Sequence, residues 1–139
     1  MSSNFFRFKN LDCVVNFDNV SSVKKTDNRI IINFNYLIRK NNIDYVDYLY
    51  VDDYEYDDLC FANESWFRKN FIRLGNTWLN KSCISNVKLR DNKIIFNMNV
   101  VKPHKFVRDN ECDNALTSVF YYENGDKARF EEIVNELRG

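Results

Sequence analysis

The chain has 139 residues, enough for one domain or two very small ones, and 45% of them are apolar, so a core can form without disulfides or metals. Its 20 basic and 20 acidic side chains give a net charge of zero, which argues against a purely electrostatic nucleic-acid binder. Only three glycines and one proline occur among many Asn, Asp, Lys, Ile, Phe and Tyr residues, a bias that we interpret as AT-rich coding.

The cysteines and the N-terminus indicate a reducing compartment. The cysteines at positions 13, 60, 83 and 112 form no C-x-x-C pair, and His104 is the only histidine, so no metal site or cofactor is expected. The opening residues MSSNFFRFKN lack the features of a signal peptide, and no apolar run reaches membrane-spanning length. We therefore expect a cytoplasmic protein in the interior of a host cell, with free thiols and no membrane partner.

Strand patterns fill the first half of the chain. Apolar positions in 20–23 and 30–34 flank the turn pair Asp27-Asn28, which predicts a hairpin. A further strand is predicted over 45–51, and a short helix over roughly 53–63.

The second half repeats this order. FIRL and TWLN flank Gly75-Asn76, and ISNVKL and KIIFNMNV flank Asp91-Asn92, so two hairpins are predicted. A strand over 117–123 is followed by a C-terminal helix whose apolar residues recur at i, i+3, i+4 and i+7, namely Phe130, Ile133, Val134 and Leu137.

Residues 19–35 align with 83–99 at a shift of 64, and FFRFKN aligns with FIRLGN at a shift of 66. We therefore predict an α+β fold with two tandem antiparallel β-meander-plus-helix units, 5–67 and 71–138, packed as one compact domain, 1–139. The alternative is that two hairpins written in a narrow amino-acid alphabet look alike by chance.

Residues 44–58, which we call the acidic tyrosine segment, hold seven acids, five tyrosines and no basic side chain. One interpretation is structural, because acids in the first turn of a helix oppose the positive end of its dipole. A second is a surface that imitates DNA and binds a basic groove of a host protein. A calcium loop would require a mid-loop glycine, which the segment lacks. The partner-binding residues of the second interpretation are Asp44, Asp47, Tyr48, Tyr50, Asp52, Asp53, Tyr54, Glu55, Tyr56, Asp57 and Asp58.

Residues 68–108, which we call the basic block, carry ten basic side chains and one acidic side chain. They could bind a nucleotide or a phosphate backbone, with an aromatic ring stacking on a base. The competing interpretation is that acidic and basic blocks face each other, within the chain or across a homodimer or higher oligomer. The candidate residues for nucleotide or nucleic-acid binding are Arg68, Lys69, Arg73, Trp78, Lys88, Arg90, Lys93, Lys102, Lys105 and Arg108.

Catalytic signatures are missing from the sequence, so we expect a non-enzymatic protein. Glycines at 75, 125 and 139 cannot form a P-loop or a G-x-G-x-x-G motif. His104 lies in the basic segment VKPHKF, which is more typical of a solvated loop than of a general base. A pairing of His104 with one of the thiols stays open.

The run FIRLGNTWLNKSCISNVKLRDNKIIFNMN, followed by VFYYENGDKARFEEIVNEL, resembles a minimal pleckstrin-homology-like module found in small phage and mobile-element accessory proteins. The resemblance covers about half the chain directly and the rest through the repeat, and the first copy lacks the Gly-Asn turn. It implies a phage or mobile-element inhibitor that occupies a host macromolecule. A nucleotide- or nucleic-acid-sequestering module and a structural accessory protein are the alternatives.

Overall fold

The computed structural model describes residues 4–8, 12–27, 29–51, 64–102 and 116–139; within these ranges the side chains of 44–46, 101–102 and 116–120 are not described. The chain divides into two compact units. Unit 1 comprises Met1–Asn35 and Asp47–Asn80, and unit 2 comprises Tyr36–Val46 and Lys81–Gly139.

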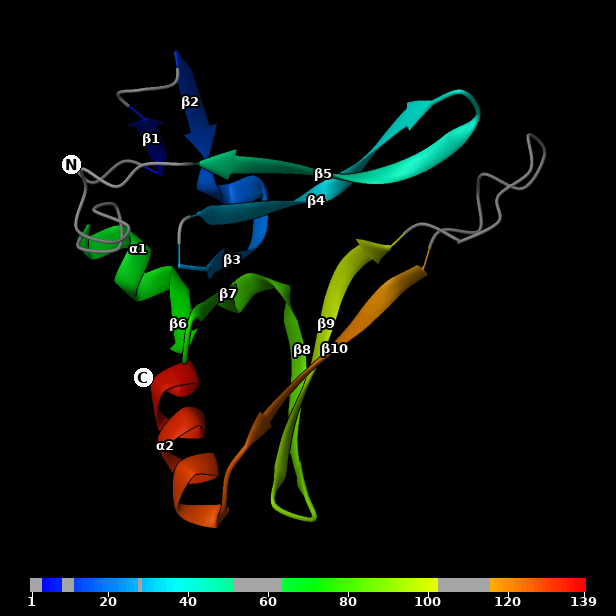
Figure 1. Ribbon diagram of the computed structural model, residues 1–139. Helices are drawn as coiled ribbons and strands as arrows, with labels where there is room; N and C mark the ends of the chain where they lie inside the picture. The colour runs from blue at the N-terminus through cyan, green and yellow to red at the C-terminus, as the bar shows by residue number, and fades with distance from the viewer. Residues whose placement is uncertain (1–3, 9–11, 28, 52–63, 103–115) are drawn as a thin grey trace. The chain divides into compact units, whose positions relative to one another are not determined.

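The largest sheet has five strands in the order β5–β4–β3–β7–β6. A separate two-stranded antiparallel sheet joins β1 to β2 (Figure 1). A 3-10 turn, η1 (Phe17–Asn19), leads from β2 into β3, and the short helix α1 (Ser65–Asn70) precedes β6. The strands are β1 (Phe5–Phe8), β2 (Cys13–Asn16), β3 (Val20–Lys25), β4 (Ile30–Lys40), β5 (Ile43–Val51), β6 (Phe71–Leu74) and β7 (Thr77–Asn80).

Aromatic side chains fill the core of unit 1. The rings of Phe67 and Phe71 stack with centroids 4.4 Å apart, and Phe17 meets Phe67 edge-on at 5.6 Å. Asn80 is buried at the end of β7, where its side-chain amide donates to the carbonyl oxygen of Val20 at 2.8 Å. Because a buried amide needs a partner, this bond ties β7 to the start of β3.

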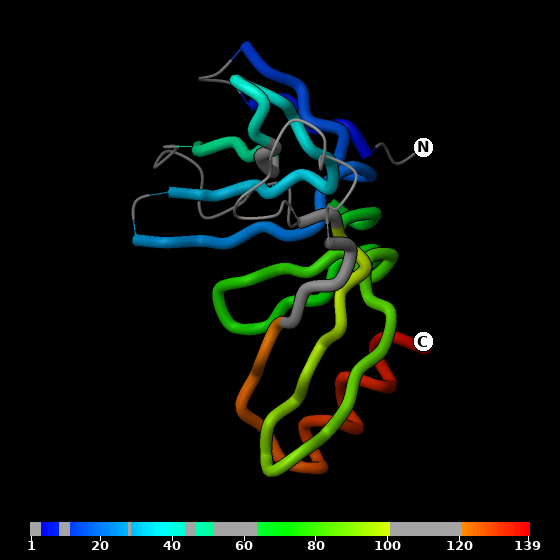
Figure 2. The backbone as a smooth tube through the Cα atoms, turned by 90° about the vertical axis from the view of Figure 1, so that its right-hand side faces the viewer, coloured from blue at the N-terminus to red at the C-terminus, as the bar shows by residue number. Residues whose placement is uncertain are grey.

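Unit 2 is a three-stranded antiparallel sheet with a helix on one face. The strands β8 (Ile84–Arg90), β9 (Lys93–Lys102) and β10 (Leu116–Asn124) lie in the order β10–β9–β8, after the turn η3 (Lys81–Cys83). The helix α2 (Lys127–Arg138) lies behind the sheet in the view of Figure 2. Its N-cap is Asp126, whose carboxylate accepts from the backbone N–H of Arg129 at 3.0 Å.

Asparagine and aspartate replace glycine in the tight turns of this glycine-poor chain. Asp91 and Asn92 have φ of 50° and 60°, and Asn41 and Asn42 have φ of 52° and 62°. Positive φ at both central residues is the signature of a type I′ hairpin turn, and Asn and Asp tolerate it best after Gly. Gly75 also has a positive φ, 63°.

The α+β class is confirmed, with the predicted hairpins at 71–80 and 84–102 and the C-terminal strand and helix at the expected positions. The predicted strand over 45–51 begins two residues earlier, at Ile43. The predicted helix over 53–63 lies outside the described residues. None of the helices in the described part of the chain is long and apolar enough to cross a membrane.

The internal repeat reappears in the strand register. Val23 pairs with Ile32 in the first copy, and Val87 pairs with Phe96 in the second, at the same shift of 64. Both pairs of strands also have a register irregularity at equivalent places, next to Val20 and next to Ile84. The compact units do not follow the repeat boundaries, because β6 and β7 belong to the sheet of unit 1. The arrangement as two tandem units within one domain stays a prediction.

Candidate nucleic-acid interface

The sheet of unit 2 has two chemically different faces, because side chains alternate along each strand. One face packs toward α2 and buries Ile94, Phe96 and Met98. The other, which we call the open face, carries polar and basic side chains and lies toward the viewer in Figure 2. The described members of the open face are Asn86, Lys88, Arg90, Lys93, Ile95, Asn97, Asn99, Tyr122 and Asn124.

Three cations of the open face lie in two adjacent cross-strand rows. Lys88, Ile95 and Tyr122 form one row, and Arg90, Lys93 and Asn124 form the next, toward the Asp91-Asn92 turn. All three cations are exposed, and no described carboxylate forms an ion pair with them. Like charges on facing strands repel at a cost of a few tenths of a kcal/mol, and an anionic ligand would relieve that repulsion.

Tyr122 gives the same face an aromatic surface. It is 58% exposed on the edge strand β10, directly opposite Ile95 of β9 and in the same cross-strand row as Lys88 of β8. One row away, the side-chain amide of Asn97 donates to the side-chain oxygen of Asn86. The face therefore combines cations, a ring and amide groups, which are the groups that bind phosphates, base faces and base edges.

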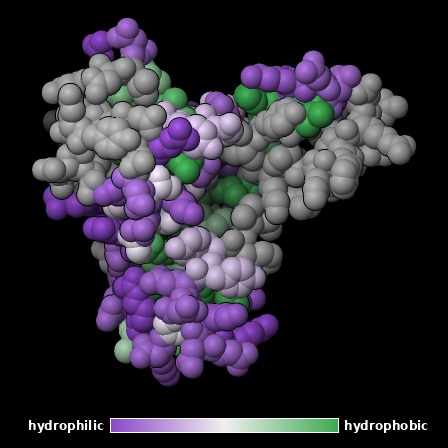
Figure 3. All heavy atoms as spheres, viewed as in Figure 1, coloured by the Kyte–Doolittle hydropathy of each residue, from purple (hydrophilic) through white to green (hydrophobic). Residues whose placement is uncertain are grey.

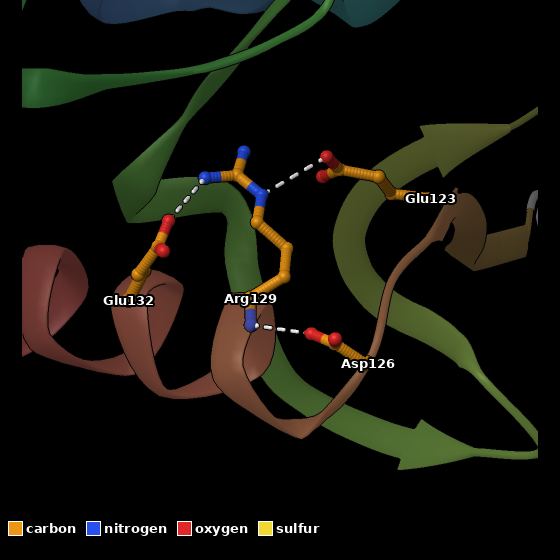
Figure 4. A network of polar contacts seen from close by, with 4 residues as sticks. All are labelled: Glu123, Asp126, Arg129 and Glu132. Atoms are coloured by element: carbon orange, nitrogen blue, oxygen red, sulfur yellow. Dashed lines mark hydrogen bonds and ion pairs between the residues drawn. The ribbon is translucent and has the colours of Figure 1, made fainter.

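The carboxylate of Glu123, on β10, lies on the opposite side of the sheet from the open face and belongs to a polar network with α2. Glu123 points toward α2, where its carboxylate accepts from Nε of Arg129 at 3.2 Å (Figure 4). Arg129 also contacts Glu132 at 3.4 Å, and its backbone N–H is held by Asp126. Burial alone would lower the pKa of Arg129, but its hydrogen bonds and charge interactions with Glu123 and Glu132 outweigh burial and raise that pKa, so the cation is retained.

The two sides of the sheet of unit 2 differ in charge. The helix α2 carries both signs, with Glu131, Glu132 and Glu136 exposed together with Lys127 and Arg138, and the surface around this helix is mostly hydrophilic in Figure 3. The cations Lys88, Arg90 and Lys93 lie on the other side of the sheet. Unit 2 thus has a helix of mixed charge and a sheet face whose described charged side chains are all basic, even though the whole chain has no net charge.

The structure brings together only part of the predicted basic block. Arg68 and Lys69 are exposed in the last turn of α1, in unit 1, while the open face belongs to unit 2. Trp78 is 8% exposed in the core of unit 1, and the guanidinium of Arg73 lies 5.0 Å from its ring centroid. The side chain of Lys102, and Lys105 and Arg108 altogether, lie outside the described residues.

Three of the predicted partner-binding residues in the acidic tyrosine segment are described with their side chains, all on β5. Tyr48 and Tyr50 are 54% and 46% exposed, with ring centroids 4.8 Å apart, and Asp47 precedes them. The guanidinium of Arg29 lies 5.2 Å from the ring centroid of Tyr50. Asp44 falls in β5 without a described side chain. The other predicted partner-binding residues lie outside the described part: Asp52, Asp53, Tyr54, Glu55, Tyr56, Asp57 and Asp58.

The described thiols and acids show no catalytic or metal-binding constellation. Cys83 is buried, and burial raises the pKa of its thiol, an effect that a hydrogen bond with Ser82 partly offsets. Cys13 is a half-buried free thiol, and His104 lies outside the described residues. Within the described ranges, no cluster of three or more His, Cys, Asp or Glu residues could hold a metal ion.

Sequence reasoning did not single out Tyr122, Asn86 or Asn97. The signal for them was present, because the alternation in TSVFYYE, ISNVKL and KIIFNMNV assigns each residue to one face once the strands are paired. Pairing is the step that the sequence leaves open. No protein-family model, curated protein or solved structure matches this chain.

Proposed function

We propose that the protein is a non-enzymatic binding protein that holds single-stranded nucleic acid on the open face of unit 2. The observation that carries the proposal is the placement of Lys88, Arg90 and Lys93 on the same sheet face as Tyr122, in its own cross-strand row and the next one. Cations supply contacts to successive phosphates, and an exposed ring stacks on a base whatever its identity. Stacking on one aromatic side chain contributes roughly 1–3 kcal/mol per base.

Single strands suit this face better than a duplex does. The face is a short patch of three strands, and the bases of a duplex are stacked on each other and unavailable to Tyr122. Because net charge is zero, long-range attraction is weak, and binding depends on local contacts. We therefore expect binding that is modest in affinity, tolerant of sequence and sensitive to salt.

Charge reversal tests the proposal directly. The variant Lys88→Glu, Arg90→Glu, Lys93→Glu should lose binding to a fluorescent oligothymidine, measured by anisotropy at low salt. The matched control reverses three exposed cations elsewhere, Arg68→Glu, Lys69→Glu and Arg138→Glu, and should bind as the unmodified protein does. Equal loss in both variants would show that only total charge matters, and unchanged binding in the first would remove the open face as the site.

A second candidate function rests on β5. Tyr48 and Tyr50 form an exposed aromatic pair next to Asp47, which is the kind of surface that docks on a basic partner protein. Under this proposal the chain is a phage or mobile-element inhibitor inside a host cell, and the acidic tyrosine segment makes the contact. Reversal of Asp53, Asp57 and Asp58 to lysine should then abolish capture of a host protein at low salt, while the open-face variant should still capture it.

A further inference from the structure

The two hairpins that open the repeats are built in the same register. Arg7 of β1 pairs with Val14 of β2, and Arg73 of β6 pairs with Trp78 of β7. Each hairpin is followed at the same distance by a 3-10 turn and then by the first long strand of its repeat, β3 or β8. The β1–β2 and β6–β7 hairpins are therefore equivalent parts of the repeat.

Within the described residues, the β6–β7 hairpin is hydrogen-bonded to a larger sheet and the β1–β2 hairpin is not. β7 pairs antiparallel with β3, with Val23 opposite Trp78 and Lys24 opposite Thr77. In the described part of the chain, β2 has β1 as its only neighbour, and β8 has β9 as its only neighbour. In the repeat, β2 is equivalent to β7, and β8 is equivalent to β3. The unpaired edges of β2 and β8 therefore correspond to the two edges that are hydrogen-bonded to each other in the β7–β3 pair.

Burial differs between equivalent positions in the way that a missing strand pairing would produce. Trp78 is 8% exposed, but its equivalent Val14 is 57% exposed. Val23 is fully buried in β3, whereas its equivalent Val87 in β8 is only half-buried. Apolar side chains lie on both unpaired edges, so joining the edges would remove apolar surface from water.

We propose that β2 of one copy of the chain adds to the edge of β8 of a second copy. The shift of 64 converts the observed pairs of β3 and β7 into the expected pairs of β8 and β2. Val14 then lies opposite Val87 of the second copy, and Cys13 lies opposite Lys88. The sheet of unit 2 then gains two strands and becomes a five-stranded sheet like that of unit 1. Because β2 and β8 are different surfaces, two copies that pair reciprocally close into a symmetric dimer, and copies that pair in one direction only generate a larger ring or a filament.

Disulfide trapping tests the register. In a chain whose native cysteines are replaced by alanine, Val14→Cys with Val87→Cys should give, under mild oxidation, cross-links between copies, either as a dimer alone or as a ladder of dimers and larger species. The matched control is Val14→Cys with Lys88→Cys, one residue away on the opposite face of β8, and it should give little cross-linking. Equal cross-linking in both, a cross-link within a single chain, or none with the first pair would overturn the proposal.

The assembly state gives a second measurement that needs no cysteine replacement. Light scattering on the purified full-length chain should show a mass above 16.7 kDa that rises with concentration, and Val14→Asp should return it to the monomer. Val14 is exposed, so this variant should keep the circular dichroism spectrum of the unmodified chain. A monomer at every concentration, or unchanged assembly in the variant, would contradict the pairing of β2 with β8.

Discussion

At the scale of single residues, Arg129 connects the last strand to the last helix. Its guanidinium contacts Glu123 at the end of β10 and Glu132 one turn along α2. One oxygen of Glu123 is buried without a hydrogen-bond partner, so Arg129 is the described partner that compensates this carboxylate. The alternation along β10 sets Glu123 on the α2 side of the sheet, opposite Ile94, and Arg129 supplies its partner there.

We expect Arg129→Ala to lower the free energy of unfolding by about 1–3 kcal/mol, because it leaves the Glu123 carboxylate partly buried and unpaired. Glu132→Gln should cost under about 1 kcal/mol, since that contact is exposed. Urea unfolding of both variants measures the difference. An Arg129→Ala variant no less stable than Glu132→Gln would show that the Glu123 contact contributes little.

The raised pKa of the Cys83 thiol predicts that the stability of the chain depends on pH. This pKa is raised in the folded chain, mainly by burial, so above the ordinary thiol pKa the unfolded chain loses this proton more readily than the folded one. The stability associated with the protonated thiol is therefore present at neutral pH and is lost as pH rises from about 8 upward. Cys83→Ala should show a smaller fall in unfolding free energy over this range. Identical slopes in Cys83→Ala and the unmodified chain would contradict the assignment.

At the scale of elements, the β10–α2 connection depends on a close approach at Gly125. The backbone N–H of Gly125 donates to the carbonyl oxygen of Asn92 at 3.0 Å. A Cβ atom at this position would lie 2.7 Å from the Cδ1 atom of Ile94 and 3.0 Å from Cγ of Arg129. The absent side chain thus allows the start of α2 to contact the β8–β9 turn.

Gly125→Ala should therefore lower the free energy of unfolding by about 1–3 kcal/mol through overpacking against Ile94. Thermal unfolding compares the stability of this variant with that of a control, Lys127→Ala. The control changes an exposed residue two positions away. Lys127→Ala should stay within about 0.5 kcal/mol of the unmodified chain. A Gly125→Ala variant of unchanged stability would mean that Ile94 can move aside at no cost.

Local elements were predictable where a turn signal and a periodic pattern coincide. Asp91-Asn92 marked the β8–β9 hairpin, and the spacing from Phe130 to Leu137 marked α2. The helix α1 was not predicted, because its six residues are too few to show a helical period. The pairing of β7 with β3 was not predicted either, since contacts between residues far apart in sequence leave no local pattern.

At the scale of the whole molecule, the opposite charges cancel in number but not in position. The acidic tyrosine segment concentrates acids, while the open face concentrates cations. Charge counts along the sequence indicated this segmentation. They could not select Lys88, Arg90 and Lys93 from the ten cations of the basic block, because that choice depends on which strands pair.

The proposed binding face predicts a specific salt dependence. Single-stranded nucleic acid releases about 0.7 counterion for each phosphate that a cation contacts, so three contacts give a slope of about −2 in a plot of log K against log salt. Replacing Lys88 or Lys93 by alanine removes one phosphate contact, so each substitution should make the slope shallower by about 0.7. Lys127→Ala should leave it unchanged, because Lys127 lies at the start of α2, off the open face. Anisotropy titrations of oligothymidine at several salt concentrations measure the slopes, and a steep slope that none of these substitutions alters would place the phosphate contacts elsewhere in the chain.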